Sequence, residues 1–455
     1  MKICHLTPHL GGGVGSVIKS FVEHSVHRGV ANTLWCLDYC HANFDGLVGV
    51  ASKKDGIFFH PSATFRSSER LVHCDVFCVH YWNHPLLVKF LSQNKLPKEK
   101  LVIWCHNSGL FEPQVLPKYL LDISSKVVFT SSCSYAAHNL QGLISVSPDR
   151  FGVVHSTRDL QKFLCIGENR SYARPRTNLL YTGTVSASKM HPESAKIFAA
   201  LSNQGFSIQV VGGPDHMQFA NAVRSHGGEI KVFGEVTDVA PFFQDADLFI
   251  YPLRPDHYGT GEQVILEAMA AGLPIIALDN PAERAILEKG GGVLATDAQD
   301  FVRHVTSVST DQPGHLKDMS VVAINRIRSE FNLERMTTSL LDIMSGTAES
   351  ARRDVVDHGE SFRPQAEIDE LVLYALHSFF DGEQMVAKAK DNLALLEDIV
   401  FERIRPSLKT SDSASKWCGL SKSTPFHYQQ YFPDNVHVRS ICQKINTECS
   451  IASGA

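Results

Sequence analysis

Two carboxylates, those of Glu262 and Glu267, stand in one short segment whose composition suits the binding of an anion. Residues 257–283 read HYGTGEQVILEAMAAGLPIIALDNPAE, which predicts a glycine-containing loop followed by a helix. Thr260, Gly261 and Glu262 are expected in the first turn of that helix, where unpaired N–H groups carry partial positive charge. A diphosphate could be bound there by backbone N–H groups alone, without a metal ion.

The two carboxylates are expected to contact different groups. Glu267 follows Glu262 by five residues, which places it roughly 140° around a helix. One acid could therefore bind a ribose while the other binds a second sugar ring. The alternative for Glu262 is a purely electrostatic role, because an acid at a helix N-terminus stabilises the helix dipole.

A second pattern that suits an anion lies earlier in the chain, in LLYTGTVSASKMHPESAKIF. A predicted strand leads through Gly183 and a short loop to Lys189, just before a helix expected to start at His191 and Pro192. A lysine beside the N–H groups of a helix start can neutralise a phosphate. The alternative is a solvated loop lysine.

A glycine-rich turn, HLGGGVGSVIKSF, follows the first predicted strand. Gly12 and Gly13 let a ligand approach the backbone at the start of a helix. The dinucleotide fingerprint GxGxxG would need glycine where Ser16 stands, although Asp38 occupies the place of a ribose-binding acid at the end of the second strand. The alternative is a turn that only lets strand and helix pack.

Two histidines are predicted at the carboxyl ends of strands, where ligands bind in open parallel sheets. His80 is expected just past one strand, in VHYWNHP, and His106 just past another, in WCHNSG. The Asn-Ser-Gly loop after His106 favours a functional role for it, whereas His80 is interpreted as structural. The eleven cysteines contain no CxxC pair, and Cys74 and Cys78 lie in an apolar run, so packing thiols and no metal site are expected.

Composition limits the class of protein that carries these residues. A chain of 455 residues is too long for one ordinary core, and 44% hydrophobic with 20% charged residues is typical of a soluble globular protein. The net charge of −5 gives no basic footprint for nucleic acid. The apolar part of the N-terminus is too short for a signal peptide, and no apolar run is long enough to span a membrane, so a cytoplasmic location is expected.

Short apolar runs alternate with helical patterns along most of the chain, which predicts parallel sheets built from βαβ units. The rhythm restarts after the polar stretch GENRSYARPRTN, which indicates two α/β domains joined near residues 157–177. The predicted parts are a first domain over residues 1–160, a second over 161–330, a crossing helix over 331–346, a linker over 347–365 and a helical extension over 366–455.

Four motifs in this order resemble retaining glycosyltransferases of the GT-B type, similar to the glycogen-synthase-like family 4. They are GGGVGS, GTVSASK, FGEVTDVAPFFQDADLFIYPL and VILEAMAAGLPIIALDNPAE, and the resemblance covers about residues 1–346. It implies two Rossmann-like, doubly wound domains that face each other across a cleft. It also implies transfer of a sugar from a nucleoside-diphosphate sugar to an acceptor hydroxyl, with retention of configuration and without a metal or other cofactor.

The resemblance assigns roles to individual residues. Lys189 matches the lysine that holds the donor diphosphate, Glu267 matches the acid that grips the ribose, and His106 resembles the first-domain histidine near the transferred sugar. The expected catalytic residues are His106, Lys189 and Glu262. The expected donor-binding residues are Gly12, Gly13, Gly183, Thr184, Lys189, Arg254, Thr260, Gly261, Glu262 and Glu267.

Two positions depart from the family pattern. The arginine expected five residues before Lys189 is Thr184, and the glutamate expected eight residues before Glu267 is Gly259. The hypothesis is that Arg254 supplies the missing charge and that Glu262 takes over the contact of the missing glutamate with the sugar.

Other readings of the same patterns stay open. They are a sugar-nucleotide epimerase of the same architecture, an NAD-dependent oxidoreductase that uses the glycine turn with Asp38, and a catalytically inactive nucleotide-binding module. For the transferase, the expected partners are a nucleotide-sugar donor and a glycan or lipid-linked acceptor in polysaccharide biosynthesis. A lipid-linked acceptor would bring peripheral association with the inner face of the membrane. The sequence specifies neither the donor, nor the acceptor, nor the oligomeric state.

Overall fold

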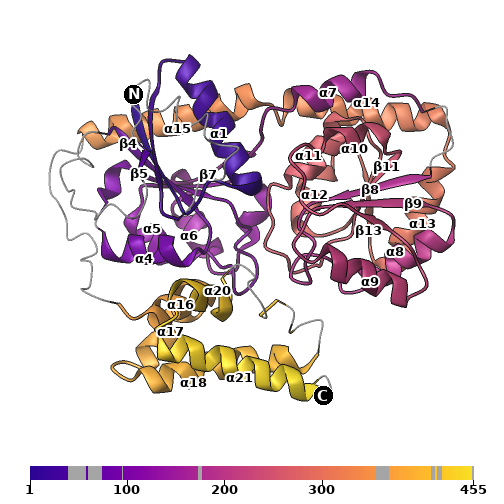
Figure 1. The fold of residues 1–455 in the computed structure, drawn as a ribbon. Coiled ribbons are helices and arrows are strands. Elements are labelled where there is room, and N and C mark those ends of the chain that lie inside the picture. The colour runs from indigo at the N-terminus through magenta and orange to yellow at the C-terminus, as the bar shows by residue number, and fades with distance from the viewer. Residues whose placement is uncertain are drawn as a thin grey trace. The chain divides into compact units, whose positions relative to one another are not determined.

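The structure is a computed structural model that describes residues 1–38, 58–59, 74–94, 96–172, 177–353, 368–410, 414, 416–417 and 423–452. The chain divides into two compact units, of which unit 1 is Met1–His155 with Met336–Ala455 and unit 2 is Ser156–Arg335. Each unit contains one parallel sheet flanked by helices (Figure 1). The chain therefore enters unit 2 at Ser156, five residues before the boundary predicted from the sequence.

Unit 1 is built on a seven-stranded sheet in the order β3-β2-β1-β4-β5-β6-β7, in which all neighbours are parallel. The order reverses direction between β1 and β4, which is the arrangement of a doubly wound Rossmann-like sheet. The strands are β1 (Lys2–Thr7), β2 (Ala31–Cys36), β3 (Phe58–Phe59), β4 (Val76–Tyr81), β5 (Leu101–Cys105), β6 (Lys126–Phe129) and β7 (Phe151–Val153).

Unit 2 repeats this plan with a six-stranded parallel sheet in the order β10-β9-β8-β11-β12-β13. The strands are β8 (Asn178–Thr182), β9 (Ser207–Val211), β10 (Lys231–Val232), β11 (Leu248–Tyr251), β12 (Ile275–Leu278) and β13 (Val293–Ala295). The predicted fold of two doubly wound α/β domains is confirmed. The sequence analysis predicted no strand at β13, because its three residues follow a run of glycines and carry no long apolar pattern.

Helices cover both faces of each sheet (Figure 1). In unit 1 they are α1 (Gly12–His27), α4 (Pro85–Gln93), α5 (Tyr119–Ile123) and α6 (Gln141–Val146), with short 3-10 helices at Lys98–Lys100, Ser132–Ala136 and Pro148–Arg150. In unit 2 they are α7 (Gln161–Glu168), α8 (Ser194–Asn203), α9 (His216–Ser225), α10 (Ala240–Asp245), α11 (Gln263–Ala270), α12 (Pro281–Leu287), α13 (Ala298–Ser309) and α14 (Pro313–Ser329).

The long helix α15 (Leu333–Arg353) begins in unit 2 and continues in unit 1. It includes residues 347–353, which the sequence analysis assigned to a linker. That assignment is wrong for these seven residues, since Met344, Thr347 and Ala348 are buried at helical spacing and continue the apolar face of the helix. The rest of the predicted linker, residues 354–365, lies outside the described residues.

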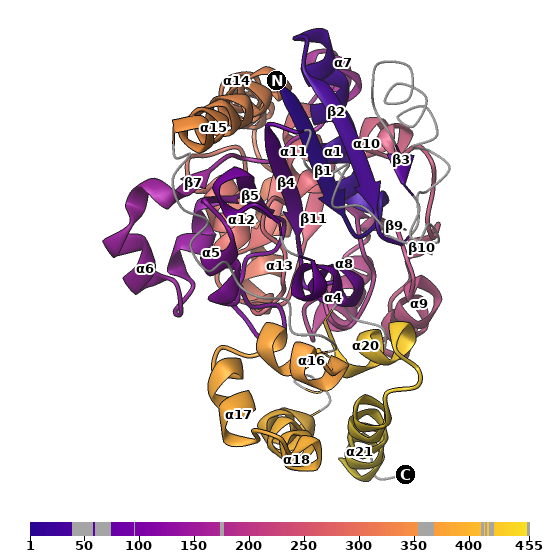
Figure 2. The same cartoon turned by 90° about the vertical axis from the view of Figure 1, so that its left-hand side faces the viewer.

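The C-terminal residues form a helical extension that packs on unit 1. Its elements are α16 (Glu370–Ser378), α17 (Gly382–Lys388), α18 (Leu393–Ile404), a 3-10 helix (Arg405–Lys409), α20 (Pro425–Tyr431) and α21 (Val436–Ala452). Figure 2 shows them together beside α4, and Lys89 of α4 forms an ion pair of 2.8 Å with Glu370. The prediction of a helical extension is confirmed. Helices α17 and α18 are separate elements, and Asp391 between them has a φ of +63°.

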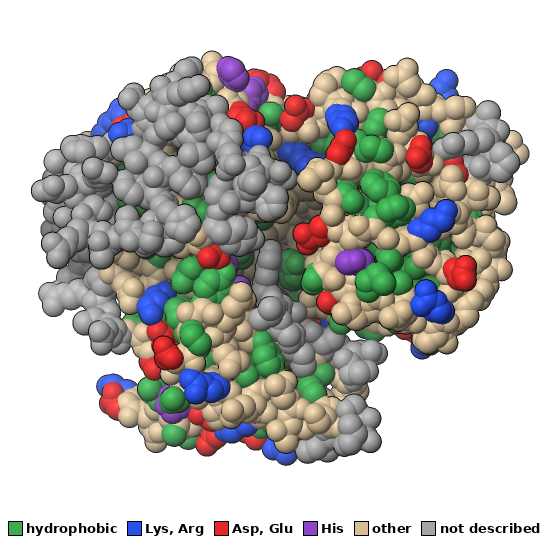
Figure 3. All heavy atoms as spheres, viewed as in Figure 1, with side chains coloured by type: hydrophobic (Ala, Val, Ile, Leu, Met, Phe, Trp, Pro, Cys, Tyr) green, Lys and Arg blue, Asp and Glu red, His purple; other side chains and the backbone are tan. Residues whose placement is uncertain are grey.

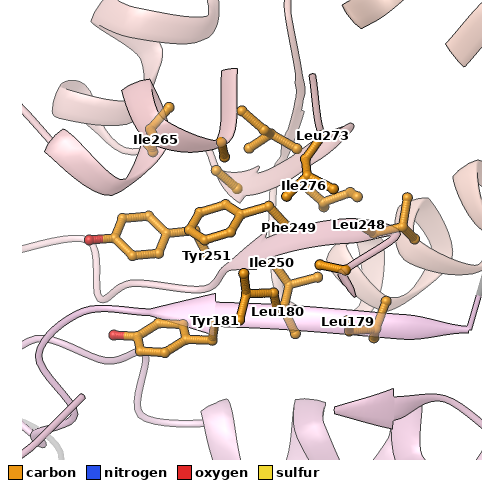
Figure 4. Packing of buried hydrophobic residues seen from close by; sticks show 14 of the residues in the cluster. Leu179, Leu180, Tyr181, Leu248, Phe249, Ile250, Tyr251, Ile265, Leu273 and Ile276 are labelled. Atoms are coloured by element: carbon orange, nitrogen blue, oxygen red, sulfur yellow. The ribbon is translucent and has the colours of Figure 1, made fainter. Parts of the chain in front are cut away.

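Part of the core of unit 2 lies between its sheet and α11 (Figure 4). Aliphatic side chains of β8 and β11 fill it, and two tyrosines stand at its edge with their hydroxyl groups on the same side. Tyr181 and Tyr251 stack with ring centroids 5.6 Å apart. Both hydroxyl groups lie where β8 and β11 end, so the apolar core positions two polar groups at that edge.

Charged side chains of both signs are interspersed on the faces of the units that Figure 3 shows, and Lys and Arg do not gather into one patch there. None of the helices in the described ranges combines the length and the apolar character needed to cross a bilayer. The cysteines in the described residues are free, and Cys74 and Cys78 are buried as expected for packing thiols.

Candidate functional site

The residues predicted to bind an anion in unit 2 lie where its strand order reverses. Strands β8 and β11 are neighbours, and the loops that follow them leave the same edge of the sheet. In open α/β sheets this point, outside the carboxyl ends of the strands, is where ligands bind. The loop after β8 carries Gly183 and Lys189, and the loop after β11 carries Arg254 and Glu262. The fold therefore brings the two predicted segments together.

Lys189 and Glu262 form a buried ion pair at this edge. The distance from Lys189 Nζ to Glu262 Oε2 is 3.0 Å, and their side chains are 12% and 6% exposed. Tyr251 donates a hydrogen bond of 2.5 Å to the same carboxylate oxygen. Figure 4 shows the Tyr251 hydroxyl pointing out of the core. The pair is thus fixed by a core residue on one side.

The electrostatics of the pair keep both partners charged. Burial alone would lower the pKa of Lys189, but the negative charge of Glu262 outweighs it and raises that pKa. Burial would likewise raise the pKa of Glu262, but Lys189, His257 and the hydrogen bond from Tyr251 together lower it. A cation held in a largely buried loop at the end of a strand is suited to bind an anionic ligand group.

The carboxylate of Glu262 fills the space beside Gly259. A Cβ atom at position 259 would lie 1.7 Å from Glu262 Oε1. A side chain at position 259 and the observed position of Glu262 therefore exclude each other. The Glu262 carboxylate therefore lies beside position 259, where the resemblance led us to expect a glutamate.

The start of α11 differs from the prediction. The helix begins at Gln263, so Thr260 and Gly261 precede it and Glu262 is its N-cap residue, which makes no capping hydrogen bond with its side chain. The prediction that these three residues form the first turn is wrong, because the Glu262 side chain turns to Lys189 and Tyr251 instead of the helix N–H groups. Thr260 is buried and Gly261 is half-buried.

His257 belongs to this cluster although the sequence analysis did not select it. Its Nδ1 accepts a hydrogen bond of 3.0 Å from the Gly259 N–H group, and its Nε2 lies 3.1 Å from the carboxylate of Glu283. Burial opposes protonation, but Glu283 outweighs it and raises the pKa of His257. The signal that could have indicated it is the position of His257 and Glu283 after neighbouring strands, β11 and β12.

Glu267 lies on α11 and contacts a different cation. Its Oε1 is 2.6 Å from Nη2 of Arg158, and its side chain is 4% exposed. Burial raises the pKa of Glu267 to about 7, and the ion pair with Arg158 offsets only part of that effect. The expectation that Glu262 and Glu267 contact different groups agrees with this geometry. Arg158 was missed because it stands in a polar segment interpreted as a domain junction.

Arg254 is buried and braces the loop that carries Lys189. Its Nε is 2.5 Å from Asp256 Oδ1, its Nη1 donates 2.9 Å to the carbonyl of Ala187, and its backbone N–H donates 3.0 Å to the carbonyl of Lys189. The cation proposed to replace the missing family arginine is therefore engaged by Asp256 and by the lysine loop.

The loop after β8 approaches the neighbouring loop after β9 very closely. Gly183 donates a hydrogen bond of 3.0 Å to Val211, and the carbonyl of Thr184 accepts one of 2.8 Å from Tyr181. A Cβ atom at Gly212, whose φ is +135°, would lie 1.9 Å from the carbonyl oxygen of Gly183. Only glycine fits at position 212 in this arrangement.

Substitution of Gly212 tests this close approach. We expect Gly212→Ala to lower the free energy of unfolding by about 3 kcal/mol, because it combines an unfavourable φ with a backbone clash. Denaturant unfolding measures the change. Gly205→Ala is the matched control, since Gly205 also has a positive φ (+91°) but meets nothing within 4 Å. Equal losses in the two variants would contradict the role of the clash.

The raised pKa of Glu267 predicts a dependence of stability on pH. The folded protein binds this proton more tightly than the unfolded chain, so the contribution of Glu267 is complete below the usual glutamate pKa of 4.5 and is lost as pH rises through about 7. Relative to Glu267→Gln, the wild type should lose up to about 3 kcal/mol between these limits. Thermal unfolding of both proteins across this range measures the difference, and parallel profiles would contradict it.

In unit 1 the glycine turn and Asp38 follow neighbouring strands. Helix α1 begins at Gly12, and the backbone of Gly12 and Gly13 is exposed. Ser16, which interrupts the dinucleotide fingerprint, donates a hydrogen bond of 3.1 Å to the Gly12 carbonyl. The carboxylate of Asp38 accepts a hydrogen bond from Tyr431 of α20. Asp38, the acid that would bind ribose if the protein were an oxidoreductase, is thus hydrogen-bonded to the C-terminal extension.

The two strand-end histidines differ in position. His106 follows β5 and is half-buried, as predicted. His80 lies inside β4 and is fully buried, so its placement past the strand end is wrong, because β4 extends to Tyr81. His80 Nδ1 is 3.1 Å from His106 Nε2. The structural histidine and the candidate functional histidine are therefore in direct contact.

Comparisons with known proteins relate part of the chain to a protein family. Residues 176–311 match the family described as "Glycosyl transferases group 1", which spans the loops that carry Lys189, Glu262 and Glu267. No curated protein sequence matches the chain. The match supports a glycosyltransferase.

Solved structures resemble the chain in fold. A glycosyltransferase from Rickettsia africae has 15% identity and a TM-score of 0.57, with 76% of this chain and 98% of that chain covered. Anabaena Alr3699/HepE, in complex with UDP and glucose, has 14% identity and a TM-score of 0.57, with 76% and 100% covered. The trehalose-6-phosphate synthase OtsA has 10% identity and a TM-score of 0.53, with 76% and 99% covered. At these identities the likeness shows the GT-B fold.

Proposed function

We propose that the protein is a retaining glycosyltransferase of family 4, which transfers a sugar from a nucleoside-diphosphate sugar to an acceptor hydroxyl. The observation that carries the proposal is the buried Lys189–Glu262 pair at the strand-order reversal of the unit that matches group 1 glycosyl transferases. A neighbour of the same fold holds UDP and glucose, which supports a nucleotide-sugar donor.

Lys189 is proposed to bind the donor diphosphate. When the bond to the sugar breaks, negative charge grows on the leaving diphosphate and positive charge grows on the sugar ring, and groups that stabilise those charges accelerate the reaction. The backbone N–H groups of Thr184 and Gly261 lie in the same two loops and would add donors, whereas the N–H group of Gly183 already donates to Val211. In this proposal no metal ion or other cofactor is needed to neutralise the diphosphate.

Glu262 is proposed to bind a hydroxyl of the transferred sugar. In the free protein its carboxylate is held by Lys189 and Tyr251. Once a diphosphate shares the charge of Lys189, the carboxylate can accept a hydrogen bond from the sugar while Tyr251 keeps it in place. The observed Glu262 carboxylate leaves no room for a side chain at position 259, which supports the proposal that Glu262 replaces the glutamate expected there.

Glu267 is proposed to bind the ribose of the donor nucleotide. A carboxylate accepts hydrogen bonds from two neighbouring hydroxyl groups only when it is ionised. Burial opposes that ionisation, and Arg158 at 2.6 Å favours it. In this proposal Arg158 favours the charged form of Glu267 that ribose binding needs.

The acceptor is proposed to contact unit 1, through the exposed backbone of Gly12 and Gly13 and through His106. A glycan or lipid-linked acceptor in polysaccharide biosynthesis, used at the inner face of the membrane, is the partner we infer for a transferase of this kind. Fold-level analogy carries this part of the proposal.

A donor screen tests the function. The protein is incubated with UDP-, GDP- and ADP-sugars and a panel of glycan acceptors, products are identified by mass spectrometry, and NMR assigns the new anomeric centre. Transfer with the donor's configuration supports the proposal, and inversion contradicts retention. Conversion of the donor without an acceptor would indicate an epimerase. Binding of NADH would indicate an oxidoreductase, and nucleotide binding without turnover would indicate an inactive module.

A further inference from the structure

Three histidines on neighbouring strands of unit 1 form one continuous hydrogen-bonded chain. His5 lies on β1 and His80 on β4, and His106 follows β5. His5 Nδ1 is 3.0 Å from His80 Nε2, and His80 Nδ1 is 3.1 Å from His106 Nε2. The rings stack with centroids 5.3 Å apart at each step. Each imidazole therefore faces the next through one nitrogen.

The first link of the chain has a fixed direction. Nε2 of His5 is 3.0 Å from Oδ1 of Asn32, whose Nδ2 donates to the carbonyl of Val30 and to Ser25 Oγ. Ser25 itself donates its hydroxyl hydrogen to the carbonyl of Val22, so its oxygen is an acceptor for Asn32. Because a carbonyl can only accept, the Asn32 amide cannot be reversed, and its oxygen must face His5.

That direction propagates along the histidines. With an acceptor at Asn32, Nε2 of His5 carries the proton and Nδ1 accepts. His80 must then donate through Nε2 and accept through Nδ1, which requires His106 to donate through Nε2. In a neutral imidazole only one nitrogen carries a proton, so Nδ1 of His106 carries a lone pair.

Burial keeps His5 and His80 neutral. His5 and His80 are fully buried. Burial lowers the pKa of His5 to about 4 and holds that of His80 well below its usual range. The chain also ends on an amide, which cannot take up a proton as a carboxylate could. The three histidines therefore fix the direction of the hydrogen bonds between them and do not transfer a net charge.

We propose that Asn32, His5 and His80 are positioning residues that hold His106 as the Nε2–H tautomer, so that its Nδ1 is a hydrogen-bond acceptor for a substrate hydroxyl. The tautomer follows from the hydrogen bonds of the free protein, and the identity of the hydroxyl rests on the proposed function. A general base or hydroxyl-orienting residue needs such a lone pair.

A bound cation would reverse this arrangement. His5, Cys78 and His80 offer ligand atoms that all lie within 4.8 Å of one another. A cation between His5 Nδ1 and His80 Nε2 would occupy the lone pair of His80 Nε2, so the proton of His80 would be on its Nδ1. His80 Nδ1 would then donate a hydrogen bond to His106 Nε2. The two alternatives therefore predict opposite tautomers of His106.

The tautomer can be read directly by NMR. Long-range ¹H–¹⁵N correlations of the imidazoles are recorded on the full chain labelled at histidine, at neutral pH, and His106→Gln identifies the signals of His106. We expect a neutral ring protonated at Nε2. A ring protonated at Nδ1, an imidazolium, or stoichiometric zinc found by elemental analysis of the same sample would each overturn the proposal.

Variants test whether Asn32 sets the tautomer. Asn32→Leu removes the terminal acceptor and should let the Nδ1–H form of His106 appear. Ser25→Ala is the matched control, because Asn32 still donates to Val30 and the tautomer should not change. An unchanged spectrum in Asn32→Leu would overturn the role of Asn32. If Asn32→Leu fails to fold, the wild-type spectrum alone still decides the tautomer.

The consequence for transfer is measured separately. With a working donor and acceptor, Asn32→Leu should lower kcat about tenfold or more while the KM for the donor stays unchanged, and Ser25→Ala should retain wild-type kcat. An equal fall in both variants would contradict the positioning role. A protein without any transferase activity would refute the proposed function but leave the NMR result standing.

Discussion

Lys189→Ala is expected to lower kcat for sugar transfer roughly a hundredfold to a thousandfold, the effect of removing one aligned donor from a developing negative charge. Lys189 is the lysine of the loop after β8. Position 184, where the resemblance led us to expect an arginine, carries threonine, and the side chain of Arg254 is paired with Asp256. Steady-state kinetics with the true donor measure the change. A fall of less than tenfold would show that the lysine is peripheral.

Two controls separate this effect from a loss of folding. Lys196→Ala removes an exposed lysine of α8, whose side chain is 62% exposed, and should leave kcat unchanged. Lys189→Ala also leaves Glu262 buried without its counter-charge, which destabilises the protein. The double variant Lys189→Met with Glu262→Gln replaces the ion pair by two neutral side chains. It should recover stability while remaining as inactive as Lys189→Ala.

Glu262→Gln should lower kcat by about a hundredfold with folding intact, because glutamine keeps the acceptor for Tyr251 but loses the charge that binds the sugar. Kinetics and a thermal unfolding curve measure the two effects. Glu288→Gln, at the exposed end of α12, is the control for loss of one carboxylate. Full activity in Glu262→Gln would remove the residue from the site.

The contact with Gly259 makes this prediction reciprocal. Gly259→Glu alone should impair folding or activity, since its Cβ would lie 1.7 Å from the carboxylate of Glu262. Combined with Glu262→Ala, the same change places a glutamate at position 259 without the contact with Glu262, although His257 Nδ1, at 2.8 Å from the Cβ position, must still shift. The double variant should therefore exceed Glu262→Ala in activity. No recovery would show that the two glutamates are not interchangeable here.

The sheets and the loops of the site could be predicted because they depend on local patterns. Buried parallel strands read as continuous apolar runs, and glycines mark the turns that follow them. Lys189, Glu262 and Glu267 were identified from such segments and from the family pattern. The structure brings the first two into contact and places the third against Arg158.

The remaining contacts depend on pairings that one sequence does not specify. His257 with Glu283 and His5 with His80 meet only because particular strands are neighbours in a particular register. The prediction of Glu262 in the first helical turn failed for a related reason, since the ion pair with Lys189 outweighs local capping. The buried face of residues 344–348 was concealed by polar neighbours in the same stretch.

The C-terminal extension meets the carboxyl ends of two strands of the first sheet. Asp38 is bound by Tyr431, and Asn83 by Ser423 and by the carbonyl of His377. Leu371, Tyr374 and Tyr428 belong to the same buried cluster as the strand residues. Removal of the C-terminal extension would expose the apolar surface of unit 1 beside α4, which would favour aggregation. We therefore expect residues 368–452 to be required for a stable preparation of the protein.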